Sequence, residues 1–245
     1  MQPTGIGPID VSQRKAARIV GSAYLLAIVT AAFGEFYVRA RLVVPNDTVQ
    51  TAQNILANER LFRLGTASDL ATYVIDVVLI AALYVVLRPV DRSLALLAAF
   101  WRIVETAVLV VVTLADFDAL RILNGVDQLR AFAPDQLQAM ARLSLAGHGT
   151  GFTVGIVFLG LGSTVFSYLW LRSRYIPRAL ATLGVLASLL AATVAFSLLI
   201  FPELIATVSL AYQVPIGVFE VTMGFWLLFR GLPQSTVAPS DASHN

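Results

Sequence analysis

The sequence has no cysteine, and only 13% of its 245 residues are charged. The absence of cysteine excludes disulfide bonds, CxxC redox motifs, cysteine nucleophiles and thiolate metal ligands. A typical soluble domain has about 25% charged and roughly 45–50% apolar residues, whereas this chain is 58% hydrophobic. One soluble core cannot bury so much apolar surface. The composition therefore excludes a water-soluble enzyme and predicts the lipid bilayer as the main partner of the chain.

Other chemistry-bearing residues and motifs are also scarce. Lys15 is the only lysine and lies outside the apolar segments, which excludes a retinal Schiff base in the membrane. His148 and His244 are the only histidines, too few for several haems with paired axial ligands. HExxH, GxSxG and nucleotide-binding glycine motifs are missing. With a net charge of +2, we expect no nucleic-acid partner, no cofactor and no catalytic residue that a motif identifies.

Six apolar segments approach or exceed the roughly 20 residues that a membrane-spanning helix needs. They lie at residues 16–36, 64–87, 94–115, 149–171, 179–201 and 208–229. The predicted fold is therefore all-α: a polytopic bundle with six transmembrane helices. We expect one transmembrane domain over residues 16–230, flanked by disordered cytoplasmic tails at 1–15 and 231–245.

Two polar-flanked segments outside the spans predict short amphipathic helices on the extracytoplasmic side. Residues 46–61 begin with Asn46 and Asp47, which suit a helix N-cap, and residues 134–147 begin with Pro134 at a first-turn position. Both segments repeat apolar residues at helical spacing.

Lys and Arg are distributed unequally between the short connections. Residues 88–93 contain two arginines and residues 172–178 contain three, whereas residues 202–213 contain none. The positive-inside rule then predicts that both termini are cytoplasmic and that the protein resides in the plasma membrane.

Five acidic or basic residues fall inside the predicted spans and away from their ends, where each costs at least about 2.5 kcal/mol and needs a partner or a cavity. They are Asp69, Asp76, Arg102, Glu105 and Glu220. At about 1.5 Å per residue from the cytoplasmic arginines, Asp76, Arg102 and Glu220 lie near one level in mid-bilayer. Because a tight turn joins the second and third spans, we predict an Arg102–Asp76 ion pair with Glu105 as a competing partner. Asp69 and Glu105 are predicted to surround this polar site.

A second polar cluster is predicted at the outer ends of the spans. Its members are Glu35, Arg39, Asp116, Asp118 and His148. Glu35 and Arg39 are four residues apart, which is the spacing of an ion pair along one helix. One histidine with two aspartates is a small basis for a metal site, and we expect none.

Gly147, Gly151 and Gly155 recur at every fourth residue of the fourth span. Small residues at this spacing allow two helices to approach closely. The stripe predicts close packing, either inside the bundle or between the copies of a homo-oligomer.

Several sequence motifs resemble the bacterial family catalogued as domain of unknown function 4386. They include EFYVRARLVVP at 35–45, LRPVDRSLALLA at 87–98 and SRYIPR at 173–178, and the resemblance spans roughly residues 15–230. It implies a six-span integral membrane protein and supplies no activity, substrate or catalytic residue.

Three interpretations of function follow from these residues. The first is a transporter-like or small-ligand-binding bundle whose mid-bilayer polar site handles a small ligand, a proton or a cation. The second is a structural or accessory membrane protein that binds lipid or a partner protein, with the charges acting only as interhelical ion pairs. The third is a membrane enzyme acting on lipid at the outer face, with His148 and either Asp116 or Asp118. They differ in where a cavity should lie: at mid-depth, nowhere, or among the external loops.

Overall fold

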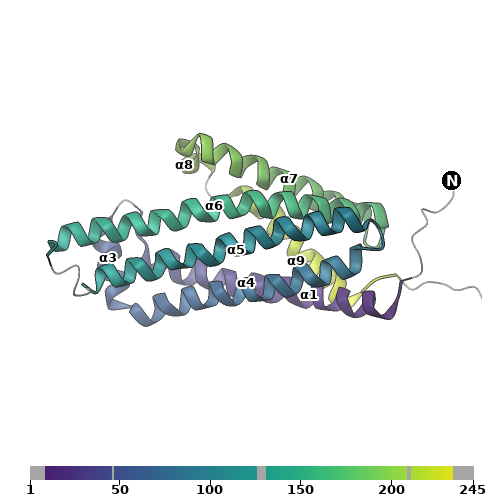
Figure 1. Ribbon diagram of the computed structural model, residues 1–245, viewed down its shortest axis with the longest axis horizontal. Coiled ribbons are helices and arrows are strands. Elements are labelled where there is room, and N and C mark those ends of the chain that lie inside the picture. The colour runs from purple at the N-terminus through teal and green to yellow at the C-terminus, as the bar shows by residue number, and fades with distance from the viewer. Residues whose placement is uncertain (1–8, 46, 126–130, 209–210, 234–245) are drawn as a thin grey trace, which may run out of the picture.

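The protein is an elongated bundle of helices in a computed structural model that describes residues 9–45, 47–125, 131–208 and 211–233. Figure 1 shows long helices that run roughly side by side, with the purple start of α1 (Val11–Ala32) near one end and α3 near the other. Among the described residues there is no strand, which confirms the predicted all-α class. The end that carries α3 is called the outer end, following the predicted orientation.

Six helices are long and apolar enough to cross a bilayer, as predicted. The first runs over α1 (Val11–Ala32), the π-helical segment η1 (Phe33–Arg39) and α2 (Ala40–Leu42). The next four are α4 (Glu59–Leu87), α5 (Arg92–Leu123), α6 (Pro134–Ser173) and α7 (Arg178–Ile200). The last comprises the 3-10 turn η4 (Ala211–Gln213) and α9 (Val214–Phe229). Before it come η3 (Pro202–Leu204) and α8 (Ile205–Val208).

The first helix begins at Val11, earlier than the predicted residue 16, because Asp10 and Gln13 form a capping box. The Asp10 carboxylate accepts from the Gln13 backbone N–H at 2.7 Å, and the Gln13 side chain accepts from the Asp10 N–H at 3.1 Å. The hydrogen bond from the Gln13 backbone N–H lowers the pKa of the Asp10 carboxyl. Residues 11–15, predicted as part of a tail, are thus helical, whereas residues 1–8 and 234–245 lie outside the described part.

One of the two predicted amphipathic helices is present as a separate element. It is α3 (Thr48–Ala57), which Asp47 caps by accepting from Gln50 N–H at 2.8 Å. The other prediction is wrong, because residues 134–147 form the first turns of the 40-residue helix α6. The glycine-rich stretch around His148 does not end α6. The backbone hydrogen bonds of the helix continue through this stretch, and α6 packs along α5.

The six long helices form a closed ring. Each helix packs on the next in the order α1, α4, α5, α6, α7 and α9, and α9 packs again on α1. The largest apolar core lies inside this ring toward the end opposite α3, and Trp170, Phe219, Met223 and Leu227 are fully buried there. Two smaller cores occupy the outer half.

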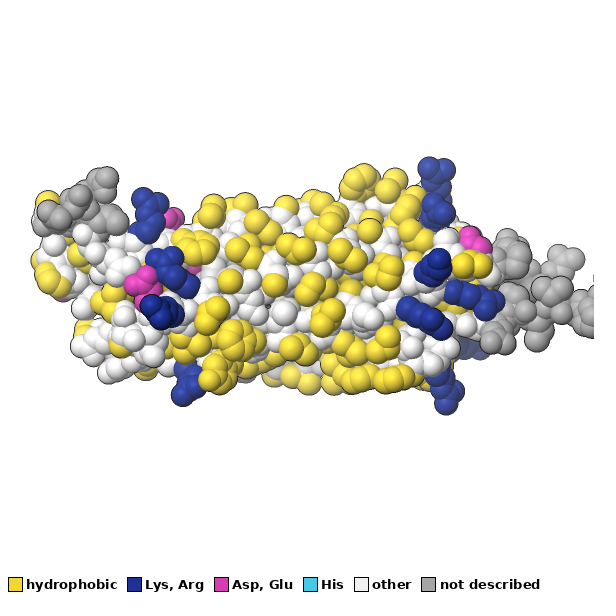
Figure 2. Space-filling model, turned by 90° about the horizontal axis from the view of Figure 1, so that it is seen from below, with side chains coloured by type: hydrophobic (Ala, Val, Ile, Leu, Met, Phe, Trp, Pro, Cys, Tyr) yellow, Lys and Arg dark blue, Asp and Glu magenta, His cyan; other side chains and the backbone are white. Residues whose placement is uncertain are grey.

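The outside of the ring is apolar over the middle of its length. Figure 2 shows this band on one face, with Lys and Arg side chains at both of its ends. Large apolar side chains such as Val74, Phe100, Val111 and Leu186 are exposed there. Such a band between two charged belts is the surface of a protein whose solvent is the hydrocarbon core of a bilayer.

Candidate functional site: two buried charged groups and an outer cavity

The predicted mid-bilayer charges meet inside the ring. Asp76 projects from α4 and Arg102 from α5, and Arg102 Nη2 lies 3.6 Å from Asp76 Oδ1. Arg102 Nη1 lies 3.2 Å from Glu105 Oε2, one turn along α5. The predicted ion pair and its competing partner are therefore both present, with Arg102 and Glu105 only 4% and 1% exposed.

Glu220 joins this group from α9 without a direct ion pair to Arg102. Its charge is near enough to act on Arg102, Asp76 and Tyr24, but among the described residues no cation lies within ion-pair distance of its carboxylate. Asp76, Arg102, Glu105 and Glu220 are called the central cluster below. Their binding of a ligand remains a prediction.

Close helix packing fixes the position of Arg102. Gly162 on α6 faces the arginine stem, and a Cβ at position 162 would lie 2.7 Å from Arg102 Cγ and 3.0 Å from the Ala98 carbonyl oxygen. The absence of a side chain at Gly162 thus lets α6 approach α5 directly over the charged residue. The central cluster is enclosed by helix backbone on this side.

Asp69 does not belong to the central cluster, contrary to the prediction. It lies on α4 seven residues before Asp76, about 10 Å farther toward the outer end, and its Oδ2 is 3.5 Å from Arg39 Nη2. The spacing of seven residues puts the two aspartates on one face of α4. They do not share one site, because the helix rise over those residues places them at different depths.

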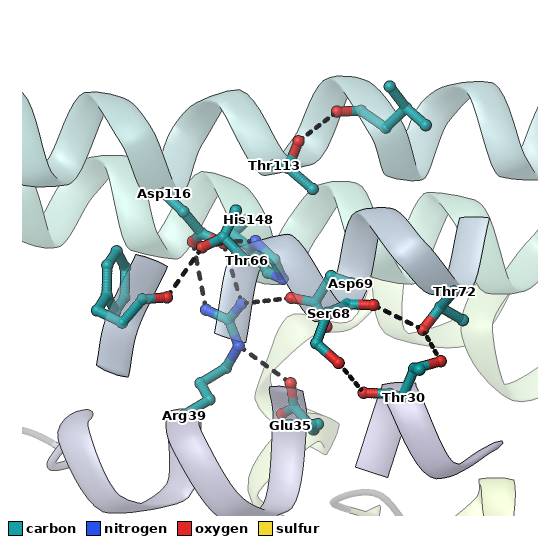
Figure 3. A network of polar contacts seen from close by, with 12 residues as sticks. Thr30, Glu35, Arg39, Thr66, Ser68, Asp69, Thr72, Thr113, Asp116 and His148 are labelled. Atoms are coloured by element: carbon teal, nitrogen blue, oxygen red, sulfur yellow. Dashed lines mark hydrogen bonds and ion pairs between the residues drawn. The ribbon is translucent and has the colours of Figure 1, made fainter. Parts of the chain in front are cut away.

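Arg39 is the centre of a second, partly buried group of charged side chains at the outer end, shown in Figure 3. Its Nε donates to Glu35 Oε2 at 3.0 Å, and its Nη1 and Nη2 donate to Asp116 Oδ1 and Oδ2 at 3.3 and 3.1 Å. Together with the Asp69 contact, one guanidinium faces three carboxylates from three helical segments. Glu35, Arg39, Asp69, Asp116 and His148 are called the outer network. The sequence predicted the Glu35–Arg39 contact, but not the role of Arg39 as a hub.

Asp116 connects Arg39 to His148. It has no solvent exposure, and its Oδ1 lies 3.2 Å from His148 Nδ1 on α6. Thr66 on α4 donates its hydroxyl to Asp116 Oδ2 at 3.5 Å. The two atoms face each other without the geometry of a hydrogen bond. The carboxylate still favours a proton on Nδ1, which leaves Nε2 of His148 to interact with another group.

The sequence around Arg39 adopts a π-helix, an uncommon form that often occurs at functional sites. This segment, η1, carries both Glu35 and Arg39. Within it Gly34 packs against Asp69, whose carboxylate occupies the space that a Cβ at position 34 would need. The wider helical turn and the missing side chain thus bring η1 against α4 where the charges meet.

Asp118 is not a member of the outer network, contrary to the prediction. Its side chain is 60% exposed and lies 3.8 Å from Arg121 on the same helix. It lies two positions after Asp116, and this offset turns its side chain to a different face of α5. The sequence showed both aspartates near the membrane surface, but only the packing distinguishes the buried one.

A cavity of about 300 Å³ opens beside the outer network. Its polar lining comes from Glu35, Arg39, Arg142, His148, Thr153, Tyr212 and Gln213, and its apolar lining from Val43, Leu145, Phe152, Leu198 and Ile205, with Gly149 between them. The side chain of His148 reaches both Asp116 and this cavity. Sequence analysis did not identify Arg142, Tyr212 or Gln213, which lie on two segments distant in sequence, α6 and η4, and share no motif.

Two of the three glycines in the predicted packing stripe face α5 of the same chain. A Cβ at Gly151 would meet the Val112 side chain, and a Cβ at Gly155 would lie 2.7 Å from Leu109 Cδ2. Gly147 has open space around it. The stripe thus serves packing within the bundle, and the homo-oligomer stays a prediction. In the described part of the chain, no group of three or more metal-ligating side chains is arranged to hold an ion.

The ring of six apolar helices around buried charges defines a multi-pass integral membrane protein. Its family model matches residues 19–231, and the chain belongs to the family described as domain of unknown function (DUF4386). This confirms the resemblance found in the sequence. No match was found among curated proteins or among solved structures.

Proposed function

We propose that this protein is a transporter-like membrane bundle that binds a small amphipathic ligand in its outer cavity. The observation that carries the proposal is the cavity of about 300 Å³ whose wall includes Arg39 and His148, the two residues that flank the buried Asp116. This volume lies at the lower end of the range for small-molecule sites, which combine an apolar lining with a few fixed polar groups.

The cavity favours the outer end over the central cluster as the ligand site. None of the four central residues lines this cavity or the smaller hollow beside α3. The backbone of α6 at Gly162 packs directly on Arg102, which leaves little room for a molecule. The mid-bilayer ligand site of the sequence interpretation therefore moves, in this proposal, to the cavity at the outer end.

The outer network would act as a rigid polar wall of the site. Arg39 uses most of its donors on Glu35, Asp69 and Asp116, so it holds these side chains rather than the ligand. His148 offers Nε2 once Asp116 fixes its Nδ1. Phe152 and Leu198 lie among the apolar lining and would contact the apolar part of the ligand.

Two glycines on α6 provide a sharp test. Neither Gly149 nor Gly147 has an atom within 4 Å of an added Cβ, but only Gly149 lines the cavity. Gly149→Leu should fill the cavity without disturbing the fold, and Gly147→Leu is the matched control. Native mass spectrometry of gently extracted protein should detect a small molecule retained by wild type and Gly147→Leu and lost from Gly149→Leu. Equal retention by both variants, or only bulk lipid on wild type, contradicts the proposal.

The Asp116–His148 pair favours a second candidate function, acid–base catalysis on a lipid at the outer face. A histidine oriented by a buried carboxylate is a common general base. Purified protein in liposomes should then convert a lipid, and His148→Gln should abolish the conversion while Asp118→Asn leaves it intact. Unchanged lipid composition, measured by mass spectrometry after incubation with wild type, rules this function out.

A further inference from the structure

The central cluster contains more negative charge than its one arginine can balance. Asp76, Glu105 and Glu220 face Arg102, and their full ionisation would leave two uncompensated negative charges inside the ring. Counted from Arg88, Arg92 and Arg230, these residues lie about 15–20 Å from the cytoplasmic arginines. At that depth the medium around the bundle is hydrocarbon, in which an isolated ionised group is very costly.

We infer that the central cluster is a proton-binding site in the membrane interior, and that Glu220 carries its exchangeable proton. Asp76 and Glu105 are the two carboxylates within 4 Å of Arg102, at 3.6 and 3.2 Å. Glu220 is the member whose carboxylate has no ion pair among the described residues. It therefore has the most to gain from protonation.

An imperfect contact inside the cluster supports this assignment independently of the charge count. Arg102 Nη1 and Glu105 Oε2 form a buried ion pair at 3.2 Å, but neither atom has a hydrogen-bond partner of good geometry among the described residues. A buried polar atom without a good hydrogen bond is costly. A bound proton converts a carboxylate into a hydrogen-bond donor, so the cluster combines excess negative charge with an acceptor that its ion pair does not satisfy.

The packing favours a proton over a metal cation. A hard cation such as Ca²⁺ takes six or more oxygen ligands around a space of its own, whereas the central residues line neither described cavity and Gly162 lies against Arg102. The Arg102 guanidinium in the middle of the cluster would also repel a cation. A proton needs no volume and resides on one oxygen.

This site goes beyond the proposed ligand cavity and does not depend on it. Intramembrane carboxylates of this kind mark proton relays in pumps and transporters. Asp69 of the outer network and Asp76 of the central cluster are about 10 Å apart along α4, by seven residues of helix rise. A proton bound at the central cluster would thus lie deeper in the bundle than the outer network.

Infrared spectroscopy of the full-length protein in lipid tests the inference without any ligand. Wild type at neutral pH should show the carbonyl stretching band of a protonated carboxylic acid, and the band should shift in D₂O. Glu220→Gln should lose this band, whereas Glu203→Gln, an exposed glutamate in η3, should keep it. Circular dichroism of each variant verifies the helical fold.

Three results would overturn the assignment. The first is the absence of a protonated carboxyl band from wild type at neutral pH. This measurement does not need the variant, so it tests the assignment even if Glu220→Gln does not fold. The second is a band that persists unchanged in folded Glu220→Gln. The third is a band that appears only after sodium is removed, which would make the occupant a metal cation. The glycine variants of the cavity remain a separate test, so the two proposals can fail independently.

Discussion

Arg39 of the first transmembrane helix and Asp116 of the third form a two-pronged ion pair, with Nη1–Oδ1 and Nη2–Oδ2 distances of 3.3 and 3.1 Å. The carboxylate of Asp116 is fully buried, whereas the Arg39 side chain is 17% exposed and lines the outer cavity, so this contact joins two helices at the cavity wall. Four further contacts are anchored on the same pair, from Glu35, Thr66, Asp69 and His148. The predictions below begin with this relationship.

Removal of the Asp116 charge should destabilise the protein. Asp116→Asn keeps the shape of the side chain but weakens hydrogen bonds to a charged group, which are each worth about 1.5–3 kcal/mol. We expect the free energy of unfolding, measured by SDS titration in mixed micelles, to fall by about 2 kcal/mol. Asp118→Asn is the matched control, because exposed substitutions change stability by roughly 0.5 kcal/mol or less. Similar losses in both variants would contradict a special role for Asp116.

Replacement of Arg39 by lysine should be harmful although the charge is kept. A lysine ammonium cannot donate to Glu35 and both oxygens of Asp116 in the geometry of a guanidinium fork. Arg39→Lys should lower the free energy of unfolding by about 1–3 kcal/mol. Arg41→Lys, at an exposed position two residues later, should have little effect. If Arg39→Lys and Arg41→Lys have the same free energy of unfolding, the network depends on net charge and not on the geometry of the guanidinium fork.

Addition of one methyl group at Gly162 should disturb the central cluster. The new Cβ would press on the Arg102 stem and the Ala98 carbonyl, and such overpacking typically costs about 1–3 kcal/mol. Gly147→Ala on the same helix should instead stabilise the protein by up to about 1 kcal/mol, because alanine favours helix and the space is open. Thermal unfolding of both variants should therefore shift in opposite directions. A shift of the same sign in both would show that α6 does not approach α5 as described.

The orientation of the chain can be tested with single cysteines, since the wild type has none. Ser12 is exposed at the start of the first transmembrane helix, and Gln50 is exposed on α3, which follows the other end of that helix. Because the positive-inside rule predicts a cytoplasmic amino terminus, a membrane-impermeant thiol reagent on intact cells should label Gln50→Cys. Ser12→Cys should react only after permeabilisation. The reverse pattern would place the cavity on the cytoplasmic side.

The number of spans and the Arg102–Asp76 pair could be predicted because each depends on local information. Hydrocarbon thickness sets the length of an apolar helix, and the tight turn between α4 and α5 makes them antiparallel neighbours. The continuity of α6 was not predictable in the same way. Its glycines favour a break locally, but the packing of Gly151 and Gly155 on α5 keeps the helix intact.

The sequence by itself determined that this protein is a six-span membrane bundle with charges at two depths, because composition and helix rise depend on residue order alone. Only the tertiary structure decided how those charges are shared. In the structure Asp69 contacts Arg39 and not the central cluster, and Asp118 lies apart from the buried Asp116. One cavity is lined by Arg142, Tyr212 and Gln213. The physical reason is that rotation of helices about their axes and their contacts across the ring arise from packing between distant segments, which residue spacing along one helix does not record.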